Sequence, residues 1–185
     1  MSRFIVFCYG DSSRLSTWSN APYFLTDTLR KKGHTIHRVD ITPPTLFSRI
    51  YDATIRRIIR LASRGSQHSS LRSWFSKIYI EKIIRQTVRK ESEADYCLFF
   101  GFDYYNRYNH IPSILLGDWT FEILLKDRLH NSSINCIDRR FIRQQNSAIK
   151  NASLVISLFP DSAKKIKTAV PESNVHYLGR NVVNN

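Results

Sequence analysis

An α/β domain built on a mostly parallel β-sheet is the fold class that this sequence predicts, for three reasons. The run Phe4–Tyr9 is apolar without alternation, as a parallel strand covered on both faces requires. An amphipathic stretch, Ala21–Lys32, separates it from an alternating strand at Thr35–Ile41, which makes a βαβ unit. The same rhythm of short strands and helices resumes after Asp95. We therefore expect a sheet of about six or seven strands.

The remaining elements follow from apolar runs and helical spacing. Pro22 suits the first turn of the first helix, and Gly33 suits its C-terminal stop. Further strands are expected at Tyr96–Phe100, Ile111–Leu116, Ser153–Ser157 and Asn174–Leu178. Further helices are expected at Leu46–Ser63, Ser70–Lys90, Phe121–Leu129, Cys136–Asn151 and Asp161–Ala169. Asp161 or Ser162 is available to cap the last helix. Together these elements predict a Rossmann-like three-layer α/β/α domain.

Length, charge and cysteine content bound the function. At 185 residues the chain suits one well-buried domain. Its net charge of +13 predicts an anionic partner: nucleic acid, an acidic membrane surface or a phosphorylated substrate. Of three cysteines, Cys8 and Cys97 fall in expected buried strands, which favours a reducing, cytoplasmic compartment. No signal peptide is visible and no window reaches the roughly 20 apolar residues that span a bilayer, so we expect a soluble or peripheral protein.

The segment 46–90 carries most of the charge. Between Arg49 and Lys90 lie eleven basic residues and two carboxylates, among apolar residues at helical spacing. Basic amphipathic helices with Trp and Phe suit anionic lipid interfaces. Alternatively, these helices cover the sheet with one face and expose their charges to water, or they bind nucleic acid. The candidate membrane-surface residues are Arg56, Arg57, Arg60, Arg64, Arg72, Lys77, Lys82 and Arg85.

Polar residues gather after three of the expected strands, where open parallel sheets bind their ligands. The first such loop mixes hydroxyls, a carboxylate, an amide and an indole, which suits ring hydroxyls better than a bare phosphate. Its candidate ligand-binding residues are Gly10, Asp11, Ser12, Ser13, Ser16, Thr17, Trp18, Ser19 and Asn20. The alternative is that its hydroxyls only cap the following helix.

The second candidate is Gly117–Thr120, which is expected to face the same crevice as the first loop. A carboxylate there can orient a hydroxyl or assist proton removal, so Asp118 is the candidate catalytic residue and Trp119 a candidate ligand contact. Alternatively, Asp118 or Thr120 caps the next helix.

The third candidate loop, Gly101–His110, is dense in Tyr and contains Asp103. Aromatic and polar groups in one loop suit sugar or base stacking, and they also suit a packed surface loop. The sequence has no G-x-x-x-x-G-K-[ST] phosphate loop, dinucleotide fingerprint, zinc-ligand spacing or G-x-S-x-G elbow. We therefore expect no metal site.

The order of these motifs resembles the N-terminal half of GT-B glycosyltransferases, in particular glycosyltransferase family 4. GDSSRLSTWSNAPYFLTDTLRKKGHTIHRVDI resembles the family's glycine-bearing loop, first helix and G-H-x-V turn, with Asn20 where Gly is usual. IPSILLGDWTFEIL is similar to its I-P strand, with Asp118 where many members carry His, so no histidine role is carried over. QQNSAIKNASLVISLFPDSAKKI and NVHYLGRNVVNN resemble its later helix and strands and its interdomain linker.

The resemblance implies an acceptor-binding domain over 1–178 and the start of a linker at 179–185, half of a GT-B fold. It implies sugar transfer, with retention, to a cell-envelope, lipid-linked or polysaccharide acceptor in carbohydrate biosynthesis. The nucleotide-sugar donor would bind a second domain, in the same or a separate chain, without which this chain would be inactive. No cofactor is expected on this domain itself.

The resemblance also gives the basic helices a role, because acceptor domains of this class often dock on anionic membranes. It thus implies peripheral attachment to the cytoplasmic face of a membrane. Two alternatives from other classes remain. One is a non-catalytic membrane-anchoring subunit of a split glycosyltransferase, and the other is a nucleic-acid-binding module.

Overall fold

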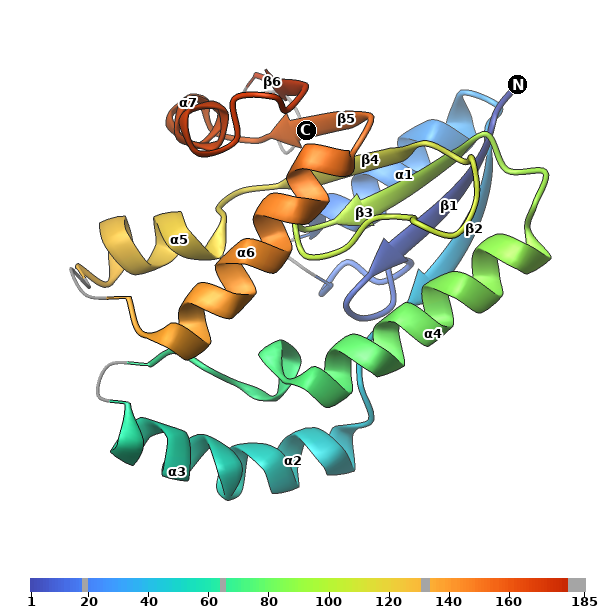
Figure 1. Ribbon diagram of the computed structural model, residues 1–185. Coiled ribbons are helices and arrows are strands. Elements are labelled where there is room, and N and C mark those ends of the chain that lie inside the picture. The colour runs from blue at the N-terminus through green and yellow to red at the C-terminus, as the bar shows by residue number, and fades with distance from the viewer. Residues whose placement is uncertain (18–19, 64–65, 131–133, 180–185) are drawn as a thin grey trace.

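The computed structural model describes residues 1–17, 20–63, 66–130 and 134–179. Its centre is a six-stranded, all-parallel sheet in the order β2-β1-β3-β4-β5-β6 (Figure 1). The strands are β1 (Arg3–Cys8), β2 (Thr35–Asp40), β3 (Tyr96–Phe100), β4 (Ser113–Gly117), β5 (Leu154–Ser157) and β6 (Val175–Tyr177). The predicted fold class is confirmed.

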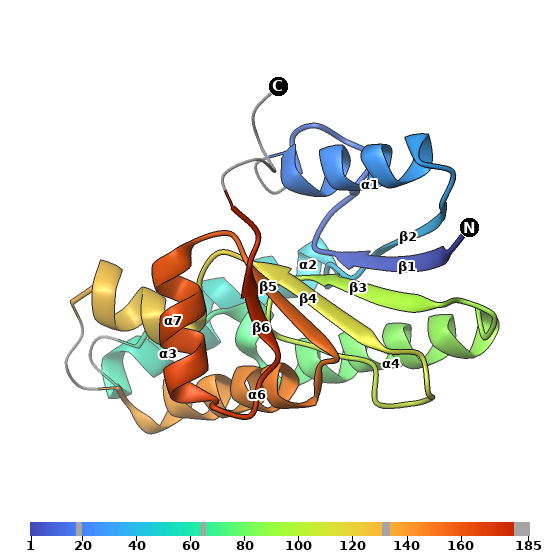
Figure 2. The same cartoon turned by 90° about the horizontal axis from the view of Figure 1, so that it is seen from above.

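Helices lie on both faces of the sheet and make three layers (Figure 2). They are α1 (Ala21–Lys31), α2 (Thr45–Ala53), α3 (Ile55–Ala62), the 3-10 turn η2 (Ser70–Arg72), α4 (Trp74–Lys90), α5 (Phe121–Ile123), the π-helical η3 (Leu124–Arg128), α6 (Cys136–Asn151) and α7 (Pro160–Ala169). On one face, Leu25 of α1 packs against Val6 and Leu98. On the other face, Ile84 of α4 and Ile149 of α6 belong to the larger core.

The connections create a topological switch point between β1 and β3. The chain leaves β1 through α1 toward β2, and it returns to β3 through α4 on the opposite face (Figure 2). Crossovers on opposite faces leave a crevice beyond the carboxyl ends of the two central strands. Tyr9 and Gly101 follow those ends directly, so the fold places both at the usual ligand position of a doubly wound sheet.

The expected helix Leu46–Ser63 is broken at Thr54 into α2 and α3. The Thr54 hydroxyl donates to the carbonyl of Ile50 at 2.7 Å, a local bond that competes with regular helix geometry. The expected helix Ser70–Lys90 likewise divides into η2 and α4. Ser73 is extended there, and its hydroxyl accepts from the Ser76 amide at 3.1 Å as an N-cap.

The turn and cap signals of the sequence are confirmed at α1 and wrong at α7. Pro22 lies in the first turn of α1, and Gly33 ends that helix with a φ of +85°, as predicted. The predicted cap of the last helix is wrong, because α7 begins at Pro160 and has no side-chain cap. Cys8 and Cys97 are buried as predicted, and burial raises the pKa of each thiol to about 12. Within the described ranges, no helix is both long and apolar enough to cross a bilayer.

Candidate functional site

A cavity of about 400 Å³ opens at the switch point, beyond the carboxyl ends of β3 and β4. Residues from well-separated parts of the chain line it, including Tyr9 after β1, Arg72 of η2, Asp103 after β3, Asp118 and Trp119 after β4, and Gln145 of α6. Its size falls in the usual range of small-ligand sites. The structure therefore brings together the predicted residues Asp103, Asp118 and Trp119.

Two glycines shape the cavity wall. Gly101 has a φ of +115°, which side chains rarely adopt, and so it lets the chain turn sharply away at the end of β3. At Gly117 the constraint is space, because an added Cβ would lie 2.9 Å from the Phe102 ring. The ring of Phe102 thus packs directly on the backbone of β4 at the edge of the cavity.

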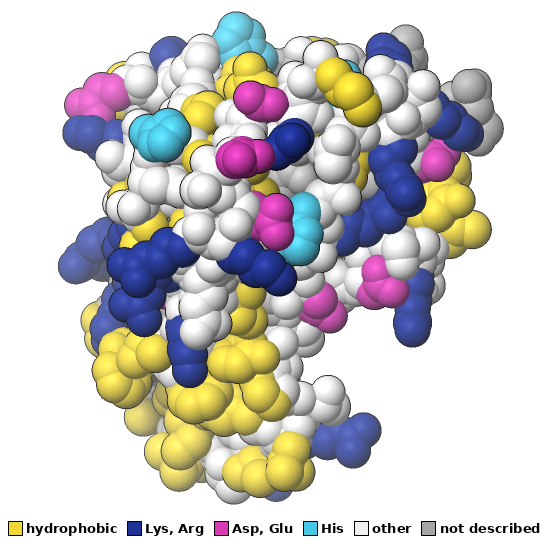
Figure 3. All heavy atoms as spheres, turned by 90° about the vertical axis from the view of Figure 1, so that its right-hand side faces the viewer, with side chains coloured by type: hydrophobic (Ala, Val, Ile, Leu, Met, Phe, Trp, Pro, Cys, Tyr) yellow, Lys and Arg dark blue, Asp and Glu magenta, His cyan; other side chains and the backbone are white. Residues whose placement is uncertain are grey.

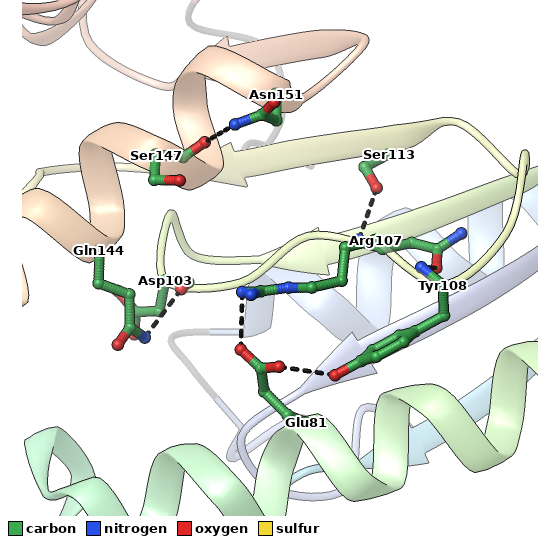
Figure 4. Close-up of polar contacts among 9 residues, drawn as sticks. Glu81, Asp103, Arg107, Tyr108, Ser113, Gln144, Ser147 and Asn151 are labelled. Carbon is green, nitrogen blue, oxygen red and sulfur yellow. Dashed lines mark hydrogen bonds and ion pairs between the residues drawn. The ribbon is translucent and has the colours of Figure 1, made fainter.

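Asp103 is held by a network of amides. Its Oδ1 accepts a hydrogen bond from Gln145 Nε2 at 2.6 Å, and its Oδ2 faces the Tyr9 hydroxyl at 3.4 Å. Its main-chain carbonyl accepts from Gln144 Nε2 at 3.1 Å (Figure 4). Gln145 also accepts from the Phe121 amide at 2.6 Å, which joins α6 to the start of α5. This carboxylate therefore organises the cavity wall.

Burial sets the protonation behaviour of this network. Loss of solvation raises the pKa of Asp103 above its usual range, although Gln145 and the charge of Arg72 act against it. Burial, reinforced by the charge of Asp103, also raises the pKa of Tyr9 well above its usual value. Tyr9 thus remains a neutral hydroxyl donor at neutral pH.

Asp118 differs because its carboxylate is not fully used. Within the described part of the chain, its Oδ1 is shielded from solvent and has no hydrogen-bond partner. Burial raises the pKa of this carboxyl. Of the two residues proposed as a helix cap, it is Thr120 that accepts from the Ile123 amide, at 3.3 Å. Asp118 is left to meet a ligand hydroxyl, or to take a proton from one.

Arg72 supplies a positive charge to the cavity. Its guanidinium carbon lies 4.0 Å from the centre of the Phe121 ring, and its Nη1 donates to the Gln67 carbonyl at 2.5 Å. Desolvation lowers the pKa of this guanidinium, which stays protonated at neutral pH. The sequence predicted Arg72 on a membrane-facing surface, and the structure places it half-buried in the cavity wall instead.

Polar groups of the loop after β1 hydrogen-bond to one another. Asp11 Oδ1 accepts from the amide and hydroxyl of Ser13 at 2.8 and 2.6 Å, and Thr17 donates to the Asp11 carbonyl at 2.5 Å. The amide of Gly10 donates to Asp40 Oδ1 at 3.0 Å and to Thr42 Oγ1 at 2.7 Å, which fixes the loop to the end of β2. No described residue of 10–20 lines the cavity.

The other residues of this loop have varied positions. Ser12 is buried, Ser16 is exposed, and Trp18 and Ser19 lie outside the described residues. Asn20 precedes α1 with a φ of +69° and makes no side-chain cap. The left-handed backbone of Asn20 is one that glycine adopts readily. The alternative of simple helix capping by this loop is therefore not realised among its described side chains.

Most of the predicted membrane-surface residues lie on α3 and α4. Arg57, Arg60, Lys82 and Arg85 are exposed, Arg56 and Lys77 are half-buried, and Arg64 lies outside the described residues. Neither α2 nor α3 contains a buried residue. The exposed apolar side chains here, called the apolar patch below, are Leu46, Ile50, Ile55, Ile58, Leu61, Trp74, Phe75 and Ile78.

The apolar patch draws its side chains from α2, α3 and α4, and aromatic packing joins α2 to α4. The ring of Phe47 in α2 lies 4.1 Å from that of Phe75 in α4, so the two helices present their apolar side chains together. Figure 3 shows apolar side chains gathered over the lower part of the molecule, where these helices lie, with lysines and arginines above them. Leu61 and Leu46 are 83% and 71% exposed. Single exposed apolar residues are normal on a protein surface, but a group of them is not.

Fold and cavity together define an α/β domain with helices on both faces of a parallel sheet and a cavity of small-ligand size at its topological switch point. Comparisons with models of protein families, with curated proteins and with solved structures found no match to this chain. Within the described ranges, no group of three His, Cys, Asp or Glu side chains is placed to hold a metal ion.

Among the polar side chains of the cavity, sequence reasoning missed Tyr9, Arg72 and Gln145. Gln145 did leave a signal, because it is a polar residue between the apolar, buried residues Ile142 and Ile149 of α6. A buried amide in such a position needs a partner, and here that partner is Asp103.

Proposed function

We propose that this chain is the acceptor-binding domain of a nucleotide-sugar-dependent glycosyltransferase, and that the cavity at β3 and β4 receives the acceptor sugar. The observation that carries the proposal is the oxygen of Asp118 that has no partner among the described residues; it lines a cavity beside Trp119 at the carboxyl end of a parallel strand. The resemblance of the sequence to family 4 glycosyltransferases points in the same direction.

The chemistry of the cavity suits a hydroxyl-rich ring. Asp118 can accept a hydrogen bond from an acceptor hydroxyl, and its raised pKa suits a group that shares a proton with that hydroxyl. Trp119 offers a flat apolar surface, and Arg72, stacked on Phe121, offers a hydrogen-bond donor to the same cavity. The acceptor oxygen would then attack the anomeric carbon of a donor held by a second domain, and the nucleoside diphosphate would leave with the bonding electrons.

Saturation-transfer NMR with a panel of methyl glycosides tests acceptor binding by this chain alone. Asp118→Asn removes the charge that strengthens the hydrogen bond, so affinity should fall about tenfold. Trp119→Ala should weaken binding similarly. Asp161→Asn, at an exposed carboxylate outside the cavity, is the matched control and should bind like the wild type. Equal signals from all variants, or none from the wild type, would contradict the proposal.

We further propose that the apolar patch docks the domain on an anionic bilayer. An eight-residue helix such as α3 is marginal in water unless its apolar side is packed, yet α3 buries no residue. A membrane interface supplies that packing for Ile55, Ile58 and Leu61. Arg57 and Arg60 alternate with these apolar residues along α3 and are exposed, which suits contact with anionic headgroups. This proposal places the protein peripherally on a membrane.

Vesicle flotation tests the docking. Wild-type protein should float with vesicles of phosphatidylglycerol and phosphatidylcholine and not with phosphatidylcholine alone. Ile58→Glu with Leu61→Glu should abolish flotation, because two charges replace apolar contacts. Leu15→Glu with Leu178→Glu changes two other exposed leucines and should leave it intact. Equal binding to both vesicles, or to neither, would refute the docking.

The two tests together separate the main alternatives. Flotation without glycoside binding would favour the non-catalytic anchoring subunit. Tight binding to duplex or single-stranded nucleic acid that falls steeply with salt would instead favour the nucleic-acid module.

A further inference from the structure

A second cavity lies along α4, apart from the acceptor cavity. It has a volume of about 340 Å³, and it shares no lining residue with the cavity at β3 and β4. α4 contributes most of its wall, Tyr108 of the β3–β4 connection adds an aromatic group, and Arg140 comes from α6. We call this cavity the α4 groove.

The α4 groove is strongly cationic. Lys77, Lys82, Arg85 and Arg140 all line it, and Glu81 is the carboxylate among its lining residues. Within the described ranges, none of these four cations forms an ion pair. Gathering four like charges in one groove is unfavourable unless an anion offsets them.

Glu81 could have been that anion, because it lies four residues from both Lys77 and Arg85. This is the spacing at which helical ion pairs form. Both of its oxygens are taken elsewhere: Oε1 by Arg107 Nη2 at 2.7 Å, and Oε2 by the Tyr108 hydroxyl at 2.6 Å (Figure 4). Burial, together with the hydrogen bond to Glu81, raises the pKa of Tyr108 to about 12, so this hydroxyl keeps its proton. The charge of the groove is thus left for an external anion.

The residue types favour phosphate over other anions. An arginine fork matches two phosphate oxygens at once, and lysines add point charges around them. A phosphate monoester or diphosphate also carries more than one negative charge, which four cations can balance better than a single carboxylate can. Trp74 and Ile78, 67% and 46% exposed, add apolar surface to the groove lining.

We propose that the α4 groove is a binding site for the phosphate or diphosphate group of a phosphorylated ligand, whose apolar or ring portion lies against Trp74 and Ile78. The phosphate can come from a soluble molecule or from a lipid headgroup. This proposal stands apart from sugar transfer, since it rests on none of the residues of the acceptor cavity. It shares Trp74 and Ile78 with the apolar patch, but its phosphate-binding cations do not belong to that patch.

Titration calorimetry of the full chain with inorganic pyrophosphate tests a soluble source. Arg85→Gln with Arg140→Gln removes two charge-assisted contacts and should weaken binding about tenfold or more. Arg30→Gln with Lys32→Gln lowers the net charge equally at exposed positions around the end of α1, on the other face of the sheet, and should change affinity less than about twofold. Lys77→Gln with Lys82→Gln is a second groove variant in case the first fails to fold.

Vesicle binding tests a lipid source. Phosphatidylcholine vesicles with phosphatidic acid, a phosphate monoester, are compared with vesicles of equal surface charge that contain phosphatidylserine. A preference for phosphatidic acid that the groove variants lose and the α1 variant keeps would assign the site to a lipid headgroup. Pyrophosphate binding with the same pattern and no lipid preference would assign it to a soluble ligand. Equal losses in groove and α1 variants, or no response to either probe, would overturn the proposal.

Discussion

The loop after β1 and the segment after β4 carry the same kinds of polar residue at the same edge of the sheet, yet they differ in what those residues do. In the loop, the carboxylate of Asp11 accepts two hydrogen bonds from Ser13 and pairs with Arg14 at 3.2 Å. In the segment after β4, Asp118 has an oxygen with no partner within the described residues. One carboxylate completes a turn, and the other faces a cavity.

The difference is visible in the direction of the pKa shifts. Hydrogen bonds from Ser13 lower the pKa of Asp11, which lies at the surface. Burial raises the pKa of Asp118, because little in its surroundings stabilises the charge. A site that must bind a ligand keeps polar groups that the fold leaves unsatisfied, whereas a structural loop consumes its own. On this criterion the segment after β4 is the better functional candidate.

The largest effect is expected at the glycine of the cavity wall. Gly117→Val would push side-chain atoms into the Phe102 ring, and overpacking of this kind should destabilise the protein by about 3 kcal/mol. Gly10→Ala, in the loop, meets Thr17 at the looser distance of 3.3 Å and mainly strains a φ of +89°, so it should cost about 1 kcal/mol. Urea denaturation measures both. A Gly117→Val midpoint equal to that of Gly10→Ala would show that the wall is not tightly packed.

A smaller effect should separate the two carboxylates of the cavity. Asp103→Ala removes the acceptor of Gln145 and leaves that amide buried without a partner, at a cost of about 2 kcal/mol. Asp118→Asn removes a partly buried charge that has an unsatisfied oxygen, and it should leave stability unchanged or raise it at neutral pH. Thermal unfolding distinguishes them. If both variants lost stability equally, Asp118 would be a structural residue like Asp103.

The pKa shift of Asp118 predicts how the stability difference between Asp118→Asn and the wild type changes with pH. The pKa of Asp118 is raised in the folded state, so its carboxyl favours folding below its unfolded pKa of about 4 and loses that contribution as pH rises through the folded pKa. Asp118→Asn cannot ionise and escapes the loss. The advantage of the variant should therefore be absent at about pH 3 and appear as pH rises above about 5.

The fold could be read from the sequence because its strands are unambiguous. Phe4–Tyr9 and Tyr96–Phe100 are apolar without alternation, as strands covered on both faces are, and the helical stretches between them favour a parallel sheet. Breaks inside helices could not be foreseen equally well. The break at Thr54 depends on the hydrogen bond from its hydroxyl to the Ile50 carbonyl. Threonine also occurs in many unbroken helices, so its presence alone does not predict a break.

The site was only partly predictable, for a different reason. Asp118 and Trp119 were expected because they follow a strand end directly. Arg72 belongs to a run of basic residues that all look alike in sequence, and only tertiary packing stacks this one on Phe121. The loop that contains Asp11 was predicted to bind a ligand from its polar composition. That composition does not reveal that the polar groups of the loop hydrogen-bond to one another.

The smallest effect is expected in that loop. Asp11→Ala removes the acceptor for Ser13, so the melting temperature should fall slightly at neutral pH. The pKa of Asp11 is lowered in the folded state, and its stabilising contribution is present above about pH 4 and disappears as pH falls through the folded pKa. Variant and wild type should thus converge in strong acid, where Asp118→Asn also converges but from the opposite side. Because Asp11 lies outside the cavity lining, glycoside binding by Asp11→Ala should match that of the wild type. A loss of binding would show that the loop after β1 contributes to the acceptor site.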